Sequence, residues 1–122
     1  MVDFTGWSCV NCRKMEDNVW SQPKILKKLS DDYVLISLYV DDKTLLPEKE
    51  QYISKFTNKK IKTTGSKWSD LQSRIFNVNS QPYYVLLDNN GKLLAKPTGY
   101  TPDADQYAKF LDEGLCRFKL RK

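Results

Sequence analysis

The sequence predicts an α/β fold in which a mixed central sheet is covered by helices on both faces. Two apolar runs, residues 33–40 and 83–87, are rich in the β-branched and aromatic residues that favour strands. Amphipathic helical patterns separate and follow these runs, and an Asp-Asn-Asn-Gly turn signal directly follows the second one. The predicted order is therefore β-α-β-α-β-β-α, with two parallel strands joined by a right-handed crossover and a final antiparallel hairpin.

The first half of the chain predicts a strand, two helices and a second strand. Residues 2–4 indicate a short buried strand, and residues 10–20 a helix. Pro23 suits the first turn of another helix, which runs to about Leu29. The nearly continuous apolar run 33–40 indicates a central strand covered on both faces. The apolar stripe of the first helix comprises Val10, Met15, Val19 and Trp20.

Residues 41–65 form a polar, lysine-rich insertion between the second strand and the next helix. Tyr52, Ile53 and Phe56 have the spacing of one face of a short helix. Residues 60–62 indicate either a small strand or a turn. We therefore expect a short helix in the middle of this insertion.

The second half of the chain predicts two helices around a hairpin. Ser66 is a suitable cap for a helix over 67–76, and residues 103–115 form the last amphipathic helix. Between them, the strand 83–87 turns and returns over 93–96. The side chains expected to face inward are Trp68, Leu71, Ile75 and Phe76 of the earlier helix, and Tyr107, Phe110, Leu111 and Leu115 of the last one.

Length and composition indicate a single soluble domain over residues 1–122. No apolar run reaches the roughly 20 residues needed to span a membrane. The net charge is +5, and its densest groups, residues 59–62 and 117–122, are interpreted as a solvated surface and a tail. No basic, aromatic-bearing motif indicates nucleic-acid binding, and a monomer is the default expectation. Because the chain opens inside a predicted strand, we expect it to be a fragment of a longer protein.

The motif that points most directly to chemistry is Cys9-Val10-Asn11-Cys12. Its spacing suits metal binding or thiol–disulfide exchange. A tetrahedral zinc site or a four-thiolate iron–sulfur cluster needs more ligands than 3 Cys and no His supply. A c-type haem needs His after the second Cys, where Arg13 stands. The remaining interpretations are a redox dithiol that needs no cofactor and a two-thiolate copper(I) site.

In a redox dithiol the two cysteines have different expected tasks. Cys9 lies at the start of the predicted helix, where unpaired N–H groups stabilise a thiolate, so it is the expected nucleophile. Cys12 follows about one turn later on the same side and is placed to resolve a mixed disulfide. The third cysteine, Cys116, is expected to be a buried small apolar residue, with an exposed intermolecular thiol as the alternative.

This order of elements, with the two cysteines at the junction of the first strand and first helix, resembles the thioredoxin fold. Asp3, six residues before Cys9, matches the acid that such proteins often bury beneath the active site. The loop of Gln81 and Pro82 matches the place of the family's cis-proline, which implies that this loop faces the dithiol. Gly99, after the hairpin, matches a common family glycine.

Residues 2–20 are more closely similar to the C-terminal domain of DsbD-type thiol:disulfide interchange proteins. The CVNC motif and the polar segment 41–65, which is longer than in compact members of the family, resemble the form from Bacteroidetes-type bacteria. Glu16, four residues after Cys12, matches a second acid near the dithiol of that family. One departure is Ser8, where thioredoxin carries a tryptophan directly before the first cysteine. Trp7 stands one place earlier and either lines the rim of the active site or simply packs.

The resemblance implies a protein-disulfide reductase domain in the periplasm, as a soluble part of an inner-membrane protein. It implies that electrons pass from a transmembrane dithiol of the same protein, through Cys9 and Cys12, to periplasmic thiol proteins. A buried Asp3 or Glu16 would oppose thiolate formation and move protons, whereas Arg13 would favour the thiolate. The alternatives are a free-standing thioredoxin-like reductase, a copper(I)-binding module and a redox-dead interaction domain.

Overall fold

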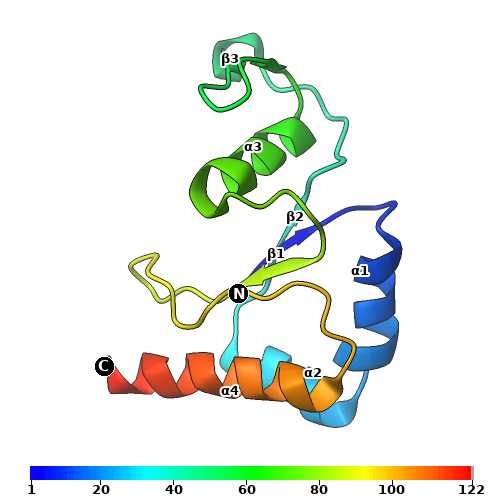
Figure 1. Ribbon diagram of the computed structural model, residues 1–122, viewed down its shortest axis with the longest axis vertical. Helices are drawn as coiled ribbons and strands as arrows, with labels where there is room; N and C mark the ends of the chain where they lie inside the picture. Colours follow the sequence, from blue (N-terminus) through cyan, green and yellow to red (C-terminus); the bar gives the residue numbers. More distant parts are fainter. Residues whose placement is uncertain (122) are drawn as a thin grey trace.

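The computed structural model describes residues 1–121 and confirms the predicted α/β class with a mixed sheet (Figure 1). The sheet has the strand order β2-β1-β5, with β2 parallel and β5 antiparallel to β1. Within the described residues, no helix combines the length and the apolar character needed to cross a bilayer. The elements are β1 (Val2–Thr5), α1 (Val10–Met15), η1 (a π-helical segment, Glu16–Trp20), α2 (Pro23–Asp32), β2 (Ile36–Tyr39), η2 (a 3-10 turn, Glu48–Glu50), β3 (Tyr52–Ile53), β4 (Lys60–Ile61), α3 (Thr64–Phe76), β5 (Tyr83–Val85) and α4 (Ala104–Leu120).

Side chains alternate along each strand between the two faces of the sheet. Phe4 of β1 lies opposite Tyr83 of β5, and Asp3 lies opposite Tyr84. Since successive side chains point to opposite faces, Phe4 and Tyr83 belong to the α3 side, while Asp3 and Tyr84 belong to the side of α1, α2 and α4. The ring centroids of Phe4 and Phe76 in α3 are 6.0 Å apart, in agreement with this division. Helices therefore cover both faces, as predicted.

The main core lies between the sheet and the layer of α1, α2 and α4. Tyr84 packs edge-on against Tyr107 of α4, with ring centroids 5.3 Å apart, and Trp20 donates a 3.1 Å hydrogen bond to the Tyr107 hydroxyl. Helices α2 and α4 lie side by side (Figure 1) and are joined by a 2.6 Å ion pair between Lys28 and Asp112. The core cluster consists of Met1, Met15, Val19, Ile25, Leu29, Tyr84, Leu86, Leu94, Ala95, Tyr107 and Leu111.

Helix α3 covers the other face, and its first turn lies against the segment that follows β2. A Cβ atom added to Gly65 would lie 2.5 Å from the Val40 carbonyl oxygen and 2.6 Å from the Asp42 backbone nitrogen, so only glycine fits there. The Gly65 N–H donates a 2.9 Å hydrogen bond to the Asp42 carbonyl group. Farther along α3, an apolar cavity of about 120 Å³ remains, lined by Val2, Phe4, Leu38, Leu71, Ile75, Phe76, Val85 and Leu87.

The prediction that residues 33–40 form a central strand covered on both faces is wrong. Only Ile36–Tyr39 form β2, and β2 lies at the edge of the sheet. Val34 and Ile36 are 78% and 51% exposed. An apolar run indicates a strand but does not identify its neighbours, because strand order depends on pairing over long sequence distances.

The short helix predicted from Tyr52, Ile53 and Phe56 is also wrong. Tyr52 and Ile53 form β3, which pairs antiparallel with β4 at Lys60–Ile61, so the strand interpretation is confirmed there. Asn58 has a φ of 61° in the connecting loop, a conformation that Asn adopts more readily than most residues. The spacing of three apolar residues could not reveal this hairpin, because its strands are only two residues long.

The return strand predicted after the Asp-Asn-Asn-Gly turn does not form as a continuous strand. The turn itself forms, but only isolated pairs follow it, Leu87 with Leu93 and Tyr84 with Thr98. The chain between Leu93 and Thr98 is longer than the facing segment, and it contains Pro97, which has no N–H to donate. The ladder is therefore interrupted between the two pairs.

The helices differ from the prediction in their ends and in two side chains. The cap of α3 is Thr63, whose Oγ1 accepts a hydrogen bond from the Ser66 N–H, so the predicted cap at Ser66 is wrong. Helix α4 continues to Leu120, beyond its predicted end. Val10 and Ile75, both predicted to face inward, are 66% and 57% exposed. Periodicity marks an apolar face but does not tell which turns of that face reach the sheet.

Candidate active site

The two cysteines lie where β1 leads into α1. Cys9 is the N-cap residue of α1, and its Sγ accepts a 3.2 Å hydrogen bond from the backbone N–H of Cys12. The two sulfur atoms form a disulfide, and the two Cα atoms are 5.2 Å apart. The N–H group therefore points at the sulfur that carries negative charge when the Cys9 thiolate forms, which favours that thiolate.

The two cysteines differ in their access to solvent. Cys9 is partly exposed, whereas Cys12 is only 2% exposed. A sulfur atom of another molecule can approach Cys9 from solvent, while the surrounding chain covers Cys12.

Asp41 holds the loop that leads to Cys9. Its carboxylate accepts hydrogen bonds from the backbone N–H groups of Trp7 at 2.9 Å and Ser8 at 3.0 Å. Burial raises the pKa of Asp41, but these hydrogen bonds outweigh burial and hold the pKa below the usual aspartate value. Sequence reasoning missed this residue. Its position just after β2 could have indicated this role. The carboxyl ends of the parallel strands β1 and β2 meet at one edge of the sheet, so residues that follow the two strands lie close together.

Trp7 packs on one side and remains open to solvent on the other. Its ring stacks on Tyr39 of β2, with centroids 4.0 Å apart and an interplanar angle of 20°. It is nevertheless 64% exposed. Both predicted interpretations therefore apply in part, since the ring packs and also forms part of the surface beside the dithiol loop.

Asp3 is a buried acid on the sheet face that α1 covers, and it is 2% exposed. Burial raises the pKa of Asp3 to about 7, and the negative charge of Glu16 adds to the increase. A 3.4 Å hydrogen bond from the Ser37 hydroxyl to Oδ2 and the positive charge of Arg13 oppose it. Within residues 1–121, the Oδ1 atom of Asp3 has no hydrogen-bond partner. The carboxyl group is thus poised to change its protonation state near neutral pH.

Arg13 links the first helix, the second acid and the sheet. Its Nη2 lies 2.9 Å from a carboxylate oxygen of Glu16 and donates a 3.2 Å hydrogen bond to Thr5 Oγ1 at the end of β1. Glu16 and Arg13 both act electrostatically on Asp3, in opposite directions. The structure therefore brings the two predicted acids together with the predicted opposing cation.

The peptide bond between Gln81 and Pro82 is cis, as the resemblance implied. Since Phe4 pairs with Tyr83 in the antiparallel register, Pro82 lies next to Thr5. This is the edge of the sheet from which the dithiol loop starts. The register thus places the proline loop and the dithiol loop at the same end of the sheet.

A buried glutamine of α3 holds the proline loop. The Nε2 atom of Gln72 donates a 3.0 Å hydrogen bond to the Ser80 carbonyl group, and its Oε1 accepts a 2.9 Å hydrogen bond from Gln81 Nε2. Gln72 is 0% exposed, so its amide group depends on these partners. Sequence reasoning missed Gln72, because a polar residue within a helical pattern is normally assigned to the solvent face.

Comparison with known proteins agrees with this geometry. A family model described as a thioredoxin-like domain matches residues 1–115. The chain belongs to this family of thioredoxin-like domains. Among solved structures, it is similar to one named DsbH oxidoreductase, with a TM-score of 0.63 and 22% sequence identity over 94% of this chain and 70% of that chain. This likeness supports the fold. No curated protein matches the chain.

The thioredoxin-like domain, with its Cys9–Cys12 disulfide at the start of α1, is a thiol–disulfide oxidoreductase. Its chemistry lies in the two sulfur atoms, which exchange two electrons as they pass between disulfide and dithiol. Among residues 1–121, no group of three or more His, Cys, Asp and Glu side chains could hold a metal ion.

Two further predicted positions can be placed in the thioredoxin-like domain. A Cβ atom on Gly99 would come within 3.4 Å of the Pro82 carbonyl oxygen, so the glycine lies beside the proline loop. Cys116 is a free, exposed thiol, so the prediction that it is buried is wrong and its alternative is correct as to exposure. Cys116 lies off the buried stripe of α4, which comprises Tyr107, Leu111 and Gly114.

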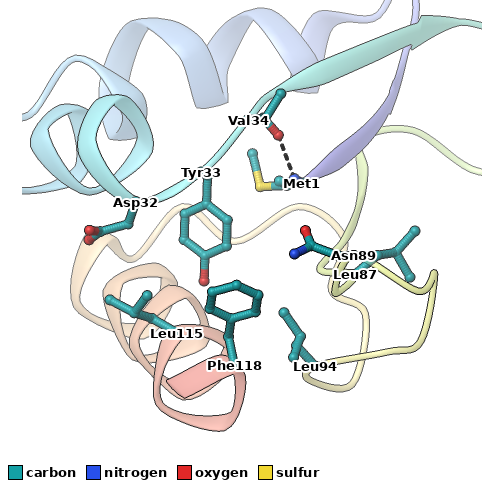
Figure 2. A pocket seen from close by; sticks show the side chains of 9 residues that line it. All are labelled: Met1, Asp32, Tyr33, Val34, Leu87, Asn89, Leu94, Leu115 and Phe118. Atoms are coloured by element: carbon teal, nitrogen blue, oxygen red, sulfur yellow. Dashed lines mark hydrogen bonds between the residues drawn. The ribbon is translucent and has the colours of Figure 1, made fainter. Parts of the chain in front are cut away.

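A pocket of about 240 Å³ lies where β1 begins, whereas the dithiol loop follows the end of β1. Figure 2 shows the residues that line this pocket. The Met1 amino group donates a 2.6 Å hydrogen bond to the Val34 carbonyl group there, and the Tyr33 hydroxyl donates to the Leu111 carbonyl group at 2.6 Å. The lining contains no cysteine, so we do not assign it to the redox site. It consists of Met1, Asp32, Tyr33, Val34, Leu87, Asn89, Leu94, Leu115 and Phe118.

Proposed function

We propose that this thioredoxin-like domain is a protein-disulfide reductase that passes electrons through the Cys9–Cys12 pair. The observation that carries the proposal is the asymmetry of the disulfide. Cys9 is partly exposed and its Sγ accepts a hydrogen bond from the Cys12 N–H, whereas Cys12 is 2% exposed. This is the arrangement that a nucleophilic and a resolving cysteine require.

In the first half of the cycle, a donor dithiol reduces the domain. One donor thiolate attacks Cys9 Sγ, breaks the Cys9–Cys12 bond and releases the Cys12 thiolate, which takes up a proton. The second donor thiol then displaces Cys9 from the mixed disulfide. The donor leaves as a disulfide, and the domain has gained two electrons, with one proton on Cys12 and Cys9 left as the thiolate.

In the second half, the domain reduces its substrate protein. The Cys9 thiolate attacks one sulfur of the substrate disulfide, which forms a mixed disulfide and releases the first substrate thiol. Cys12 then loses its proton and attacks Cys9 Sγ. The second substrate thiol leaves, and the Cys9–Cys12 disulfide is restored.

Asp3 is the proposed proton acceptor for Cys12. It is buried on the sheet face that α1 covers, and its pKa of about 7 lets it exchange a proton at neutral pH. Arg13 and Glu16 adjust this pKa from opposite directions. Asp3 would therefore set the pH at which the resolving step is fastest.

The donor in this proposal is a transmembrane dithiol of the same protein, and the recipients are periplasmic thiol proteins. The similarity of residues 2–20 to DsbD-type C-terminal domains supports this assignment, and the domain would then be the soluble periplasmic part of an inner-membrane protein. One solved structure that it resembles is itself named DsbH oxidoreductase. A complete reading frame without membrane spans would contradict this placement while leaving the exchange chemistry intact.

The decisive experiment is the equilibrium reduction potential of the Cys9–Cys12 couple in a dithiothreitol or glutathione series. We expect a value near that of thioredoxin, about −270 mV, and no reversible couple in Cys9→Ser. A strongly oxidising value, near about −120 mV, would make the domain a disulfide-forming protein and reverse the proposed electron flow. A copper(I) titration of the reduced domain tests the remaining metal interpretation, which requires stoichiometric tight binding.

A further inference from the structure

The lysine-rich insertion carries a hairpin with two different faces. This insertion hairpin comprises residues 52–61, and in Figure 1 its strand β3 lies beyond α3, away from α2 and α4. Tyr52 pairs with Ile61, and Ile53 pairs with Lys60. Paired residues share a face and successive residues alternate, so Tyr52 and Ile61 form one face and Ile53 and Lys60 the other.

The inner face of the insertion hairpin is hydrogen-bonded to α3. The Tyr52 hydroxyl donates a 2.7 Å hydrogen bond to the Asp70 carboxylate, and the buried Ser54 hydroxyl donates to the other oxygen of that carboxylate. Ser54 Oγ in turn accepts hydrogen bonds from the backbone N–H groups of Phe56 and Thr57, at 3.1 Å and 3.2 Å. The loop at the tip is therefore held in one shape by a side chain inside the domain.

The outer face and the tip carry apolar and basic side chains together. Ile53 is 66% exposed and Phe56, at the tip, is 54% exposed. Residues 43–62 contain six lysines and two glutamates, which accounts for most of the net charge of +5. Lys60 shares the outer face with Ile53. The exposed lysines on the hairpin and directly after it are Lys55, Lys59, Lys60 and Lys62. Exposed apolar side chains rimmed by polar ones are typical of sites that bind a protein or a membrane.

We propose that the insertion hairpin binds the surface of an anionic lipid bilayer, with Phe56 and Ile53 inserted between headgroups and the lysines facing lipid phosphates. Charge complementarity favours a negatively charged surface. The small size of the hairpin favours lipid over protein, because a stable protein interface comprises roughly 20–30 residues on each partner and residues 52–61 are far fewer. A bilayer requires only a few apolar side chains at headgroup depth together with nearby basic charge.

The test is sedimentation of the oxidised chain with phosphatidylcholine vesicles that contain or lack phosphatidylglycerol. We expect binding only to the anionic vesicles, and weaker binding as salt is raised. Lys59→Gln, Lys60→Gln and Lys62→Gln together should lower the partition coefficient roughly a hundredfold. The matched control removes three exposed lysines elsewhere, Lys27, Lys92 and Lys96, and should lower it only slightly.

A second variant separates insertion from simple charge attraction. Phe56→Ser should lower partitioning about tenfold, because the inserted ring is lost while every charge remains. Leu26→Ser is its control, since Leu26 of α2 is also exposed, at 52%. Each variant is first checked for reduction by dithiothreitol and for the circular dichroism of the parent chain.

Four results with the vesicles would overturn the proposal. They are absence of binding to anionic vesicles, equal binding to vesicles without phosphatidylglycerol, equal loss in the two lysine triples, and full binding by Phe56→Ser. Binding to soluble polyglutamate as tight as to vesicles, and independent of Phe56, would overturn it in favour of an acidic protein partner. None of these results depends on the reduction potential, so failure of this proposal can be distinguished from failure of the proposed function.

Discussion

The side-chain amide of Gln81 donates a 2.9 Å hydrogen bond to the side-chain Oε1 of Gln72, which is buried in α3. Gln72 in turn donates to the Ser80 carbonyl group at 3.0 Å. A helix on one face of the sheet therefore holds the segment that precedes the cis peptide bond at Pro82. The proline loop lies at the same sheet end as the dithiol loop, so its position bears on how a substrate protein meets Cys9.

Gln72→Met should separate substrate positioning from chemistry. Methionine fills a similar volume but leaves the Ser80 carbonyl and the Gln81 amide without their partner, which should lower the free energy of unfolding by about 1–3 kcal/mol. We expect KM for a protein disulfide to rise several-fold while exchange with a small disulfide keeps its rate. Gln106→Met, at an exposed position of α4, is the control. Equal changes toward large and small substrates would contradict a positioning role.

Asp3→Asn should change how the stability of the oxidised domain depends on pH. The folded-state pKa of Asp3 is about 7, against 3.8 in its ordinary state, so the folded protein binds more protons between these values. Protonated Asp3 therefore makes its full contribution to the free energy of unfolding below about pH 4, and this contribution is lost as the pH rises through 7. We expect the free energy of unfolding to fall by up to about 4 kcal/mol over this range, and to stay nearly flat in Asp3→Asn.

Denaturant unfolding at a series of pH values measures this effect. Asp17→Asn, at an exposed position, serves as the matched control and should keep the parent pH dependence. A parent curve that does not decline between pH 4 and 8 would show that the pKa of Asp3 is not raised in the folded state.

Asp41→Ala should loosen the loop before Cys9. The Trp7 and Ser8 N–H groups lose a charged acceptor, so we expect unfolding to become easier by about 1–2 kcal/mol. The pKa of Asp41 is lowered on folding, so its contribution is present above the ordinary aspartate pKa and is lost as the solution is acidified through the folded-state pKa. The near-ultraviolet circular dichroism of the Trp7–Tyr39 stack should weaken as well. Asp31→Ala, exposed on α2, should leave both readouts unchanged.

Cys116 should react with a maleimide while the Cys9–Cys12 disulfide is intact. The thiol is free and exposed, so we expect one label per oxidised chain and up to three after reduction. Mass spectrometry of the labelled chain provides the count. Cys116→Ser should abolish labelling of the oxidised chain and leave disulfide exchange unchanged. An unreactive Cys116 in the folded domain would mean that this part of α4 is covered.

Local sequence patterns determined the α/β class and the helices over 10–20, 23–29 and 103–115. They also determined that two cysteines lie at the start of the first helix. These features depend on periodicity, capping and spacing over a few residues, so they are present in the sequence itself. The family resemblance added the positions of Asp3 and the proline loop. The structure shows Asp3 buried and the Gln81–Pro82 bond cis.

Only the tertiary structure decided that β2 is an edge strand, that residues 52–61 form a hairpin, and that Asp41 and Gln72 hold the two loops at the dithiol end of the sheet. Trp7 and Asp41 are far apart in the sequence and meet because two parallel strands end at one edge of the sheet. Gln72 is a polar residue whose burial is acceptable only because the folded loop supplies its partners. Such contacts depend on which distant segments meet, and no local pattern specifies that.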